Sequence, residues 1–183
     1  AYQDYIDANP DSFSSPASLA EVQEMITAVN TAQANILAQI GTEGDKPDTV
    51  NSVVTAVQLA TLSGITGVVN ANEDAYQDYI DANPDSFSSP ASLAEVQEMI
   101  TAVNTAQANI LAQIGTEGDK PDTVNSVVTA VQLATLSGIT GVVNANEDAY
   151  QDYIDANPDS FSSPASLAEV QAMITAVNTA QAN

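Results

Sequence analysis

A perfect internal repeat constrains the fold of this chain more than any other feature. The segment AYQDYIDANP begins at Ala1, at Ala75 and at Ala149, which defines a 74-residue period. The first two copies are identical. The third, which runs to Asn183, differs only at Ala172, where the other copies have glutamate. Since this period is longer than that of common solenoid repeats and approaches the size of a small domain, the repeat predicts a tandem array of small autonomous modules.

The charge of the chain excludes several classes of protein. It has 24 acidic residues against two lysines (Lys46 and Lys120), which gives a net charge of −22. Binding to phosphate requires lysine or arginine, so nucleic-acid binding is excluded. The chain is 44% hydrophobic, which is enough to build a core, and it has no cysteine for disulfides or thiolate metal sites. No apolar run approaches the length of a membrane span, so direct membrane insertion is not expected.

Residues 56–62 are expected to form the first helix of a repeat. Thr55 is a suitable N-cap, and Ser63-Gly64 supplies the left-handed stop that commonly ends a helix. Valines at helical spacing also precede Thr55, so a start as early as Thr49 stays open. The density of β-branched residues disfavours that extension.

The second helix is expected to follow Gly67. Asn70 and Glu73 resemble a capping box, and Pro84 disfavours helical geometry at the residue before it, so the helix should end near Ala82. The loop that follows is expected to place an aromatic residue over the end of the bundle. The residues expected to be buried in this part are Val69, Tyr76, Tyr79, Ile80 and Phe87.

The third helix has the strongest sequence pattern. Ser92 and Glu95 form a capping box, and Gly115 is expected to close the helix after about 22 residues, or roughly 33 Å. The apolar residues at helical spacing are Leu93, Val96, Met99, Ile100, Val103, Ile110, Leu111 and Ile114.

The segment from Gly115 to Asp122 contains two glycines and a proline and is expected to link adjacent modules. This phase assigns residues 1–48 to the C-terminal part of a module, with helices two and three. Residues 49–122 form a complete three-helix module with its linker, and residues 123–183 form a module truncated within helix three. The predicted fold is therefore all-α, a tandem array of three-helix bundles with a 74-residue period, excerpted from a longer protein.

Two clusters of acidic residues are candidates for calcium binding. Calcium needs six to eight oxygen ligands, which clustered carboxylates could supply. Neither cluster follows the EF-hand pattern. Counted from Asp81, serines stand at the sixth and twelfth positions, where an EF-hand needs glycine and glutamate. A solvated acidic surface is the preferred interpretation, so no cofactor is predicted. The weak calcium candidates are Glu117, Asp119 and Asp122 in the linker, with a second cluster at Asp78, Asp81 and Asp85.

The sequence offers no constellation typical of an enzyme. Without histidine, cysteine or arginine, no nucleophile–base pair or oxyanion clamp can be assembled beyond serine, threonine and lysine. Tyr76 and Tyr79 could form a ligand platform, but aromatics at helical spacing are typical of a core. No catalytic or cofactor-binding residue is predicted, and the chain is not expected to be an enzyme.

Residues 54–68, 75–80 and 89–104 resemble helical repeats of very large, acidic surface and biofilm adhesins of Gram-negative, often marine, bacteria. A fainter likeness connects them to three-helix albumin-binding modules of Gram-positive surface proteins. The first resemblance implies an extracellular stalk at the bacterial cell surface that projects an adhesive end. Its partners would be the neighbouring repeats, and no residue identifies a host or matrix protein. Two alternatives stay open: a repeated binding module that acts by avidity, and a self-associating extracellular filament subunit.

Overall fold

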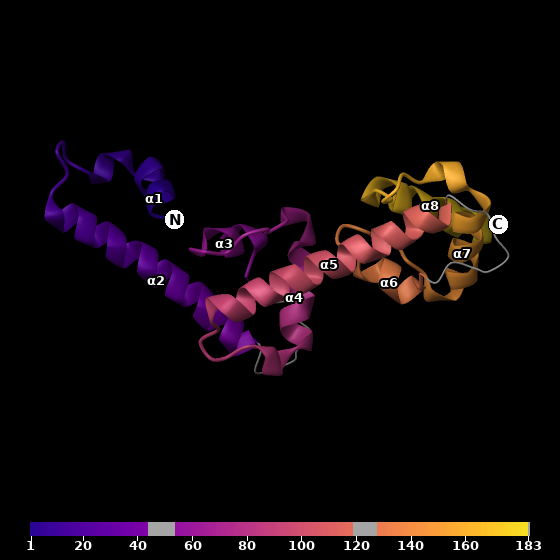
Figure 1. The fold of residues 1–183 in the computed structure, drawn as a ribbon, viewed down its shortest axis with the longest axis horizontal. Helices are drawn as coiled ribbons and strands as arrows, with labels where there is room; N and C mark the ends of the chain where they lie inside the picture. Colours follow the sequence, from indigo (N-terminus) through magenta and orange to yellow (C-terminus); the bar gives the residue numbers. More distant parts are fainter. Residues whose placement is uncertain (44–53, 119–127, 183) are drawn as a thin grey trace. The chain divides into compact units, whose positions relative to one another are not determined.

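The computed structural model describes residues 1–43, 54–118 and 128–182 (Figure 1). In these ranges every regular element is helical, which confirms the all-α class. No helix in them is both long enough and apolar enough to span a membrane. The α-helices are α1 (Tyr2–Ala8), α2 (Leu19–Glu43), α3 (Ala56–Thr61), α4 (Glu73–Ala82), α5 (Leu93–Gly118), α6 (Ala130–Thr135), α7 (Glu147–Ala156) and α8 (Leu167–Gln181).

Equivalent helices occupy equivalent positions of the sequence repeat. Helices α6 and α7 begin and end one period after α3 and α4, and each repeat has a long helix that starts two residues after a proline–alanine pair. A single turn of 3-10 helix starts at Pro10, Pro84 and Pro158, where proline fixes the first backbone angle. Local sequence therefore sets the same elements in each copy.

The chain divides into two compact units, residues 1–101 and residues 102–183. The division falls inside α5, between Thr101 and Ala102, and not in the segment from Gly115 to Asp122. The expected boundaries at 48/49 and 122/123 lie in or next to stretches outside the described residues. The repeat gives the length of the period, but packing decides where each unit begins and ends. This packing divides α5 between two cores.

The core of the second unit is built from four helices, not from the three expected. The C-terminal half of α5 packs with α6, α7 and the N-terminal part of α8. The fourth helix is needed because α6 is only six residues long and covers little of the hydrophobic surface. The core residues are Ile110, Ile114, Val128, Ala130, Leu133, Leu136, Tyr150, Ile154, Phe161, Ala165, Val170, Met173, Ile174 and Val177.

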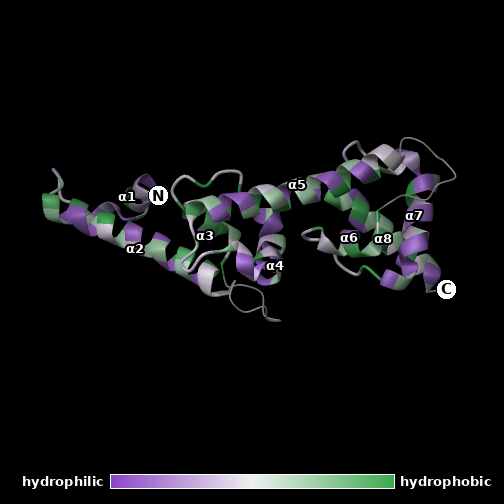
Figure 2. Ribbon diagram, turned by 60° about the horizontal axis from the view of Figure 1, so that its bottom comes forward, coloured by the Kyte–Doolittle hydropathy of each residue, from purple (hydrophilic) through white to green (hydrophobic). Residues whose placement is uncertain are grey.

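The first unit buries the equivalent residues of the preceding copy. Its long helix α2 contributes Ile36 and Ile40, which are 7% and 0% exposed. Figure 2 shows hydrophobic and hydrophilic residues interspersed along α2 and α5, as expected for helices with one buried face. The other buried apolar residues of residues 54–100 are Val54, Ala56, Leu59, Leu62, Tyr76, Ile80, Phe87, Ala91, Val96, Met99 and Ile100.

The first short helix starts at Ala56 as predicted and ends at Thr61, one residue earlier than predicted, because Leu62 is in extended backbone. The Thr55 hydroxyl accepts a hydrogen bond from the Gln58 backbone N–H, and the Gln58 side chain accepts one from the Thr55 N–H, which completes a capping box. Gly64 follows the helix with a φ of +90°, the left-handed conformation that glycine adopts at little cost. An earlier start at Thr49 falls outside the described residues.

The start of the second helix differs from the prediction. Helix α4 begins at Glu73, and its N-cap is Asn72 without a side-chain cap bond. Asn70 instead belongs to a 3-10 turn. The Glu73 carboxylate turns away from the expected capping box and accepts a hydrogen bond of 2.8 Å from the Ala56 N–H, at the start of α3. A contact between two helices thus replaces the local cap. The helix ends at Ala82, as predicted.

Two residues expected in the core are exposed. Val69 is 43% exposed because it precedes the 3-10 turn in extended backbone, and Leu93, the first residue of α5, is 38% exposed. The burial predicted for Tyr76, Ile80 and Phe87 is confirmed, and Tyr79 is half-buried. Tyr76 and Ile80 are fully buried, and Phe87 is 6% exposed, with its ring edge-on to the half-buried Tyr79 at 6.4 Å.

Candidate functional site

The most specific contact in each unit joins the second half of a long helix to the loop of the following copy. We call residues 28–43 of α2 and residues 102–118 of α5 the docking half-helices. We call the surface that holds one the receiving groove. In the second unit it is formed by Ile154, Phe161, Ala165, Val170 and Met173, which share one core with Ile110 and Ile114 of the docking half-helix.

The receiving groove recognises the half-helix through its backbone. The Ala91 N–H donates a hydrogen bond of 3.0 Å to the Leu37 carbonyl oxygen, and the Ala165 N–H donates an equivalent bond of 3.0 Å to Leu111. The helix carbonyl accepts this bond from a loop of the next copy, on the face that packs against it. The register of the half-helix is therefore fixed to a single residue.

A glycine permits this close approach. A Cβ placed on Gly115 would lie 2.5 Å from the Ser162 carbonyl oxygen and 2.9 Å from the Ala165 nitrogen, and Gly41 meets Ser88 and Ala91 in the same way. The prediction that Gly115 ends the helix is wrong, because α5 continues to Gly118. The glycine lies within the helix because only a residue without a side chain fits against the loop.

A carboxylate in the first turn of the long helix fixes the shape of the receiving loop. Glu95 accepts hydrogen bonds from the Ser92 backbone N–H at 2.7 Å and from the Ser88 hydroxyl at 2.8 Å. These donors, the Ser92 N–H foremost, lower the pKa of Glu95 from its usual 4.5 to about 2. The equivalent Glu21 and Glu169 have their pKa lowered to about 2 by the same contacts. The capping box predicted at Ser92 and Glu95 is confirmed, and it also holds the loop.

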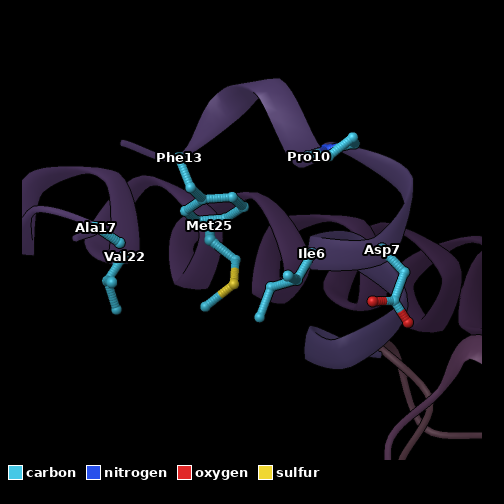
Figure 3. A pocket seen from close by; sticks show the side chains of 7 residues that line it. All are labelled: Ile6, Asp7, Pro10, Phe13, Ala17, Val22 and Met25. Atoms are coloured by element: carbon cyan, nitrogen blue, oxygen red, sulfur yellow. The ribbon is translucent and has the colours of Figure 1, made fainter. Parts of the chain in front are cut away.

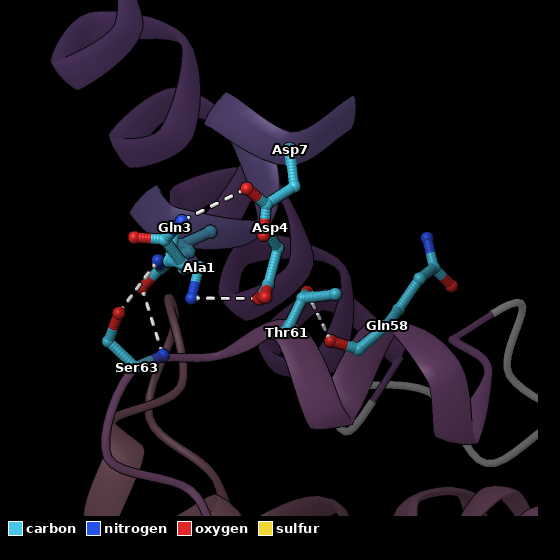
Figure 4. A network of polar contacts seen from close by, with 8 residues as sticks. Ala1, Gln3, Asp4, Asp7, Gln58, Thr61 and Ser63 are labelled. Carbon is cyan, nitrogen blue, oxygen red and sulfur yellow. Dashed lines mark hydrogen bonds and ion pairs between the residues drawn. The ribbon is translucent and has the colours of Figure 1, made fainter. Parts of the chain in front are cut away.

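A glutamine side chain of a long helix bonds to the residues at the end of each short helix, α3 and α6. The buried Gln107 donates to the Thr135 carbonyl oxygen at 2.6 Å and accepts from the Ser137 N–H at 3.0 Å. In the first unit, Gln33 accepts from the Ser63 N–H at 3.2 Å, as Gln107 does from Ser137, but it donates to the Ser63 hydroxyl at 3.0 Å and not to a backbone carbonyl. Figure 4 shows Ser63 with the two bonds that it makes. One amide thus satisfies a donor and an acceptor of the loop, as backbone pairing would.

A tyrosine hydroxyl connects α7 to the long helix that follows it, α8. Tyr150 donates to the Asn178 side-chain oxygen at 2.6 Å and accepts from the Val143 N–H at 3.0 Å. Asn178 also donates to the Gly141 carbonyl oxygen at 2.7 Å. The fully buried tyrosine therefore has its polar end satisfied, which a core aromatic requires. This arrangement makes the matching Tyr76, also fully buried, a core residue and not a ligand platform.

The first copy carries a receiving groove that is open. Figure 3 shows Ile6, Phe13 and Met25 along one face of a cavity of about 550 Å³. Ala17 and Val22 complete its apolar lining. All five correspond, one and two periods later, to residues that are buried in the filled grooves. The repeat indicates which residues line the groove.

The described residues do not include the whole linker cluster of calcium candidates. Glu117 lies in the last turn of α5, while Asp119 and Asp122 lie outside the described residues. Among the residues described, no group of three or more acidic side chains is placed to hold a metal ion. Sequence analysis missed the packing role of Gly41 and Gly115, whose only sequence signal is a glycine near the end of an apolar helical pattern.

Comparison of the chain with models of protein families, with curated proteins and with solved structures finds no match.

Proposed function

We propose that the chain is a spacer: a tandem array of helical modules with a 74-residue period, in the stalk of a large bacterial surface adhesin. The observation that carries the proposal is the docking of two long helices, α2 and α5, into the loop of the following copy, through the Ala91–Leu37 and Ala165–Leu111 hydrogen bonds. Because the same contacts recur with each copy, an added repeat adds another module without a new interface. This is the property that a spacer of adjustable length needs.

The module of this proposal differs from the bundle expected from sequence. Its core takes the second half of one long helix, a short helix, a middle helix and the first half of the next long helix. The extracellular location at a bacterial cell surface and the adhesive end rest on the resemblance of residues 54–68, 75–80 and 89–104 to adhesin repeats. The absence of histidine, cysteine and arginine supports a non-catalytic role.

Chains of two, three, four and six repeats test the spacer role. Small-angle X-ray scattering should give a maximum dimension that rises by a constant increment for each added repeat. A dimension that stops rising would contradict a spacer. Immobilised repeats should retain no specific protein from serum or matrix extracts, and saturable capture of one protein would favour the binding-module alternative.

A further inference from the structure

Helix α5 is one uninterrupted helix of 26 residues that serves two cores. The boundary between the two compact units falls inside it, after Thr101. Met99 and Ile100 lie before this boundary and are each 1% exposed, while Ile110 and Ile114 lie after it and belong to the core of the second unit. The docking half-helix is therefore the continuation of a helix that the first unit already holds.

The start of α5 has the signals that initiate a helix. The Ser92 hydroxyl accepts a hydrogen bond of 3.3 Å from the Glu95 N–H, and the Glu95 carboxylate accepts one of 2.7 Å from the Ser92 N–H. The carboxylate also lies in the first turn, where the helix dipole favours a negative charge. Val96, in the next turn, is fully buried. The first turns of α5 are thus fixed by residues of its own copy.

The docking half-helix has weak helical signals of its own. At its start, the Thr101 hydroxyl donates to the Gln97 carbonyl oxygen at 2.8 Å, as a threonine does inside a helix. Its 17 residues include two glycines, two asparagines and two threonines, which are poor helix formers. Its last turn has Glu117 and no basic residue, which the helix dipole disfavours. A segment of this length and composition is not expected to hold a helix when it is alone.

Starting a helix is far less favourable than extending one. The first turn carries a statistical factor of roughly 10⁻³, whereas each residue added to an existing helix is close to neutral. If each unit had to start its own part of α5, this factor would apply twice. Because α5 is continuous, a start at Ser92 and Glu95 also makes the docking half-helix available to the next core.

We propose that a single nucleation event in α5 serves both units, so that the folding of one unit promotes the folding of the next. The coupling passes along the helix backbone, through the exposed stretch around Ala106. This inference goes beyond the spacer role and stands without it, since it depends only on how α5 is built.

Unfolding the first unit by itself tests the proposal. Ile80→Asp places a charge at a fully buried site of that unit and should abolish slow hydrogen exchange in α4. The second unit keeps its sequence, yet the protection factor of α7 should fall about 100- to 1000-fold, because the docking half-helix must then nucleate by itself. The control Val57→Asp, at a 62% exposed site of the same unit, should leave α7 unchanged. Unchanged exchange of α7 in Ile80→Asp would overturn the proposal.

The reverse experiment uses the equivalent residue of the second unit. A coupling free energy acts equally in both directions, so Ile154→Asp should lower the protection factor of α4 by a factor similar to that seen for α7 in Ile80→Asp. An effect in one direction only would contradict a shared nucleation event.

A break in the helix tests whether the coupling passes through α5. Ala106→Pro changes an exposed residue between the two halves and interrupts the helix, so the protection factors of α4 and α7 should both fall. Adding Ile80→Asp should then lower α7 little further, because the two units are already uncoupled. If the two losses multiply, the first unit supports the second by another route and the proposal is wrong. Ala106→Gln, which keeps the helix, should behave as the parent does.

Discussion

Residues 2–25 and residues 76–99 have the same sequence but different surroundings. Tyr2 and Ile6 are 41% and 39% exposed, while Tyr76 and Ile80 are fully buried. Both copies nevertheless form an α-helix (α1 or α4), a 3-10 turn and the start of a long helix (α2 or α5). In both, a glutamate of the long helix accepts a bond from the same serine of the loop. The comparison separates two contributions: local sequence forms the elements, and the docking half-helix buries them.

The comparison predicts that one substitution will have unequal costs in the two copies. Ile80→Ala should lower the free energy of unfolding by about 2–5 kcal/mol, because it leaves a cavity at a fully buried site. Ile6→Ala should cost less than about 1.5 kcal/mol, because much of that side chain already contacts solvent. Hydrogen exchange in α4 and in α1 during urea titration measures each cost. Equal costs would show that exposure does not distinguish the copies.

A second prediction concerns the glycine of the docking half-helix. Gly115→Ala should destabilise the second unit by about 1–3 kcal/mol, because the new Cβ would lie 2.5 Å from a backbone oxygen and the loop must move. The gain in helix propensity, about 1 kcal/mol, opposes this effect only in part. The control Gln113→Ala, at an exposed position of the same helix, should change stability little. A stabilised Gly115→Ala chain would exclude the close contact.

The tyrosine hydroxyl gives a smaller difference. Tyr150→Phe removes bonds to Asn178 and Val143 in a buried setting and should cost about 1–2 kcal/mol. Tyr2→Phe removes an exposed bond of 2.7 Å to Asn30 and should cost less than about 0.5 kcal/mol. Urea melts followed by exchange in α7 and α1 measure both. A larger loss at Tyr2 would reverse the expected order.

The loop carboxylates should show the smallest difference, because their hydrogen bonds do not depend on the half-helix. Glu21 and Glu95 should each titrate with a pKa near 2 by NMR of the side-chain carboxyl carbon. Since folding lowers these pKa values, the stability they contribute is present above pH 4.5 and is lost as the pH falls toward 2.

Serine variants sharpen this last prediction. Ser14→Ala and Ser88→Ala each remove one hydroxyl donor and should raise the pKa of Glu21 and Glu95 by similar amounts. A pKa that rises in one copy only would mean that docking, and not the local loop, fixes the carboxylate.

Features set by neighbouring residues could be predicted from sequence, and features set by distant contacts could not. The Thr55 cap, the end of α4 at Ala82 and the Ser92–Glu95 box each depend on residues within four positions, and all three are confirmed. Glu73 shows the limit of this approach. Its spacing from Asn70 fits a capping box, yet its carboxylate bonds to the Ala56 N–H, 17 residues away.

The docking contact could not be predicted from sequence, because it too depends on residues far apart in the chain. A glycine at the end of an apolar helical pattern usually marks the end of a helix, and Gly115 has that pattern. Its actual role depends on a loop of the next copy, around Ser162 and Ala165, which no local rule includes. The phase of the units is hidden likewise, since a repeat of identical copies has the same period wherever the first boundary is placed.

Because the receiving loop binds the docking half-helix through a backbone bond at Leu37 or Leu111, it fixes the register of the helix but cannot distinguish one copy from another. During synthesis, a half-helix could dock into the receiving loop of the copy after the next one. The copy between them would then be left out of the array, although every contact of the docked half-helix would be the same. Packing alone does not disfavour that error, because the copies have identical contact residues. The order in which copies emerge during synthesis, with each half-helix docking into the next loop to appear, is then what keeps such an array in sequence.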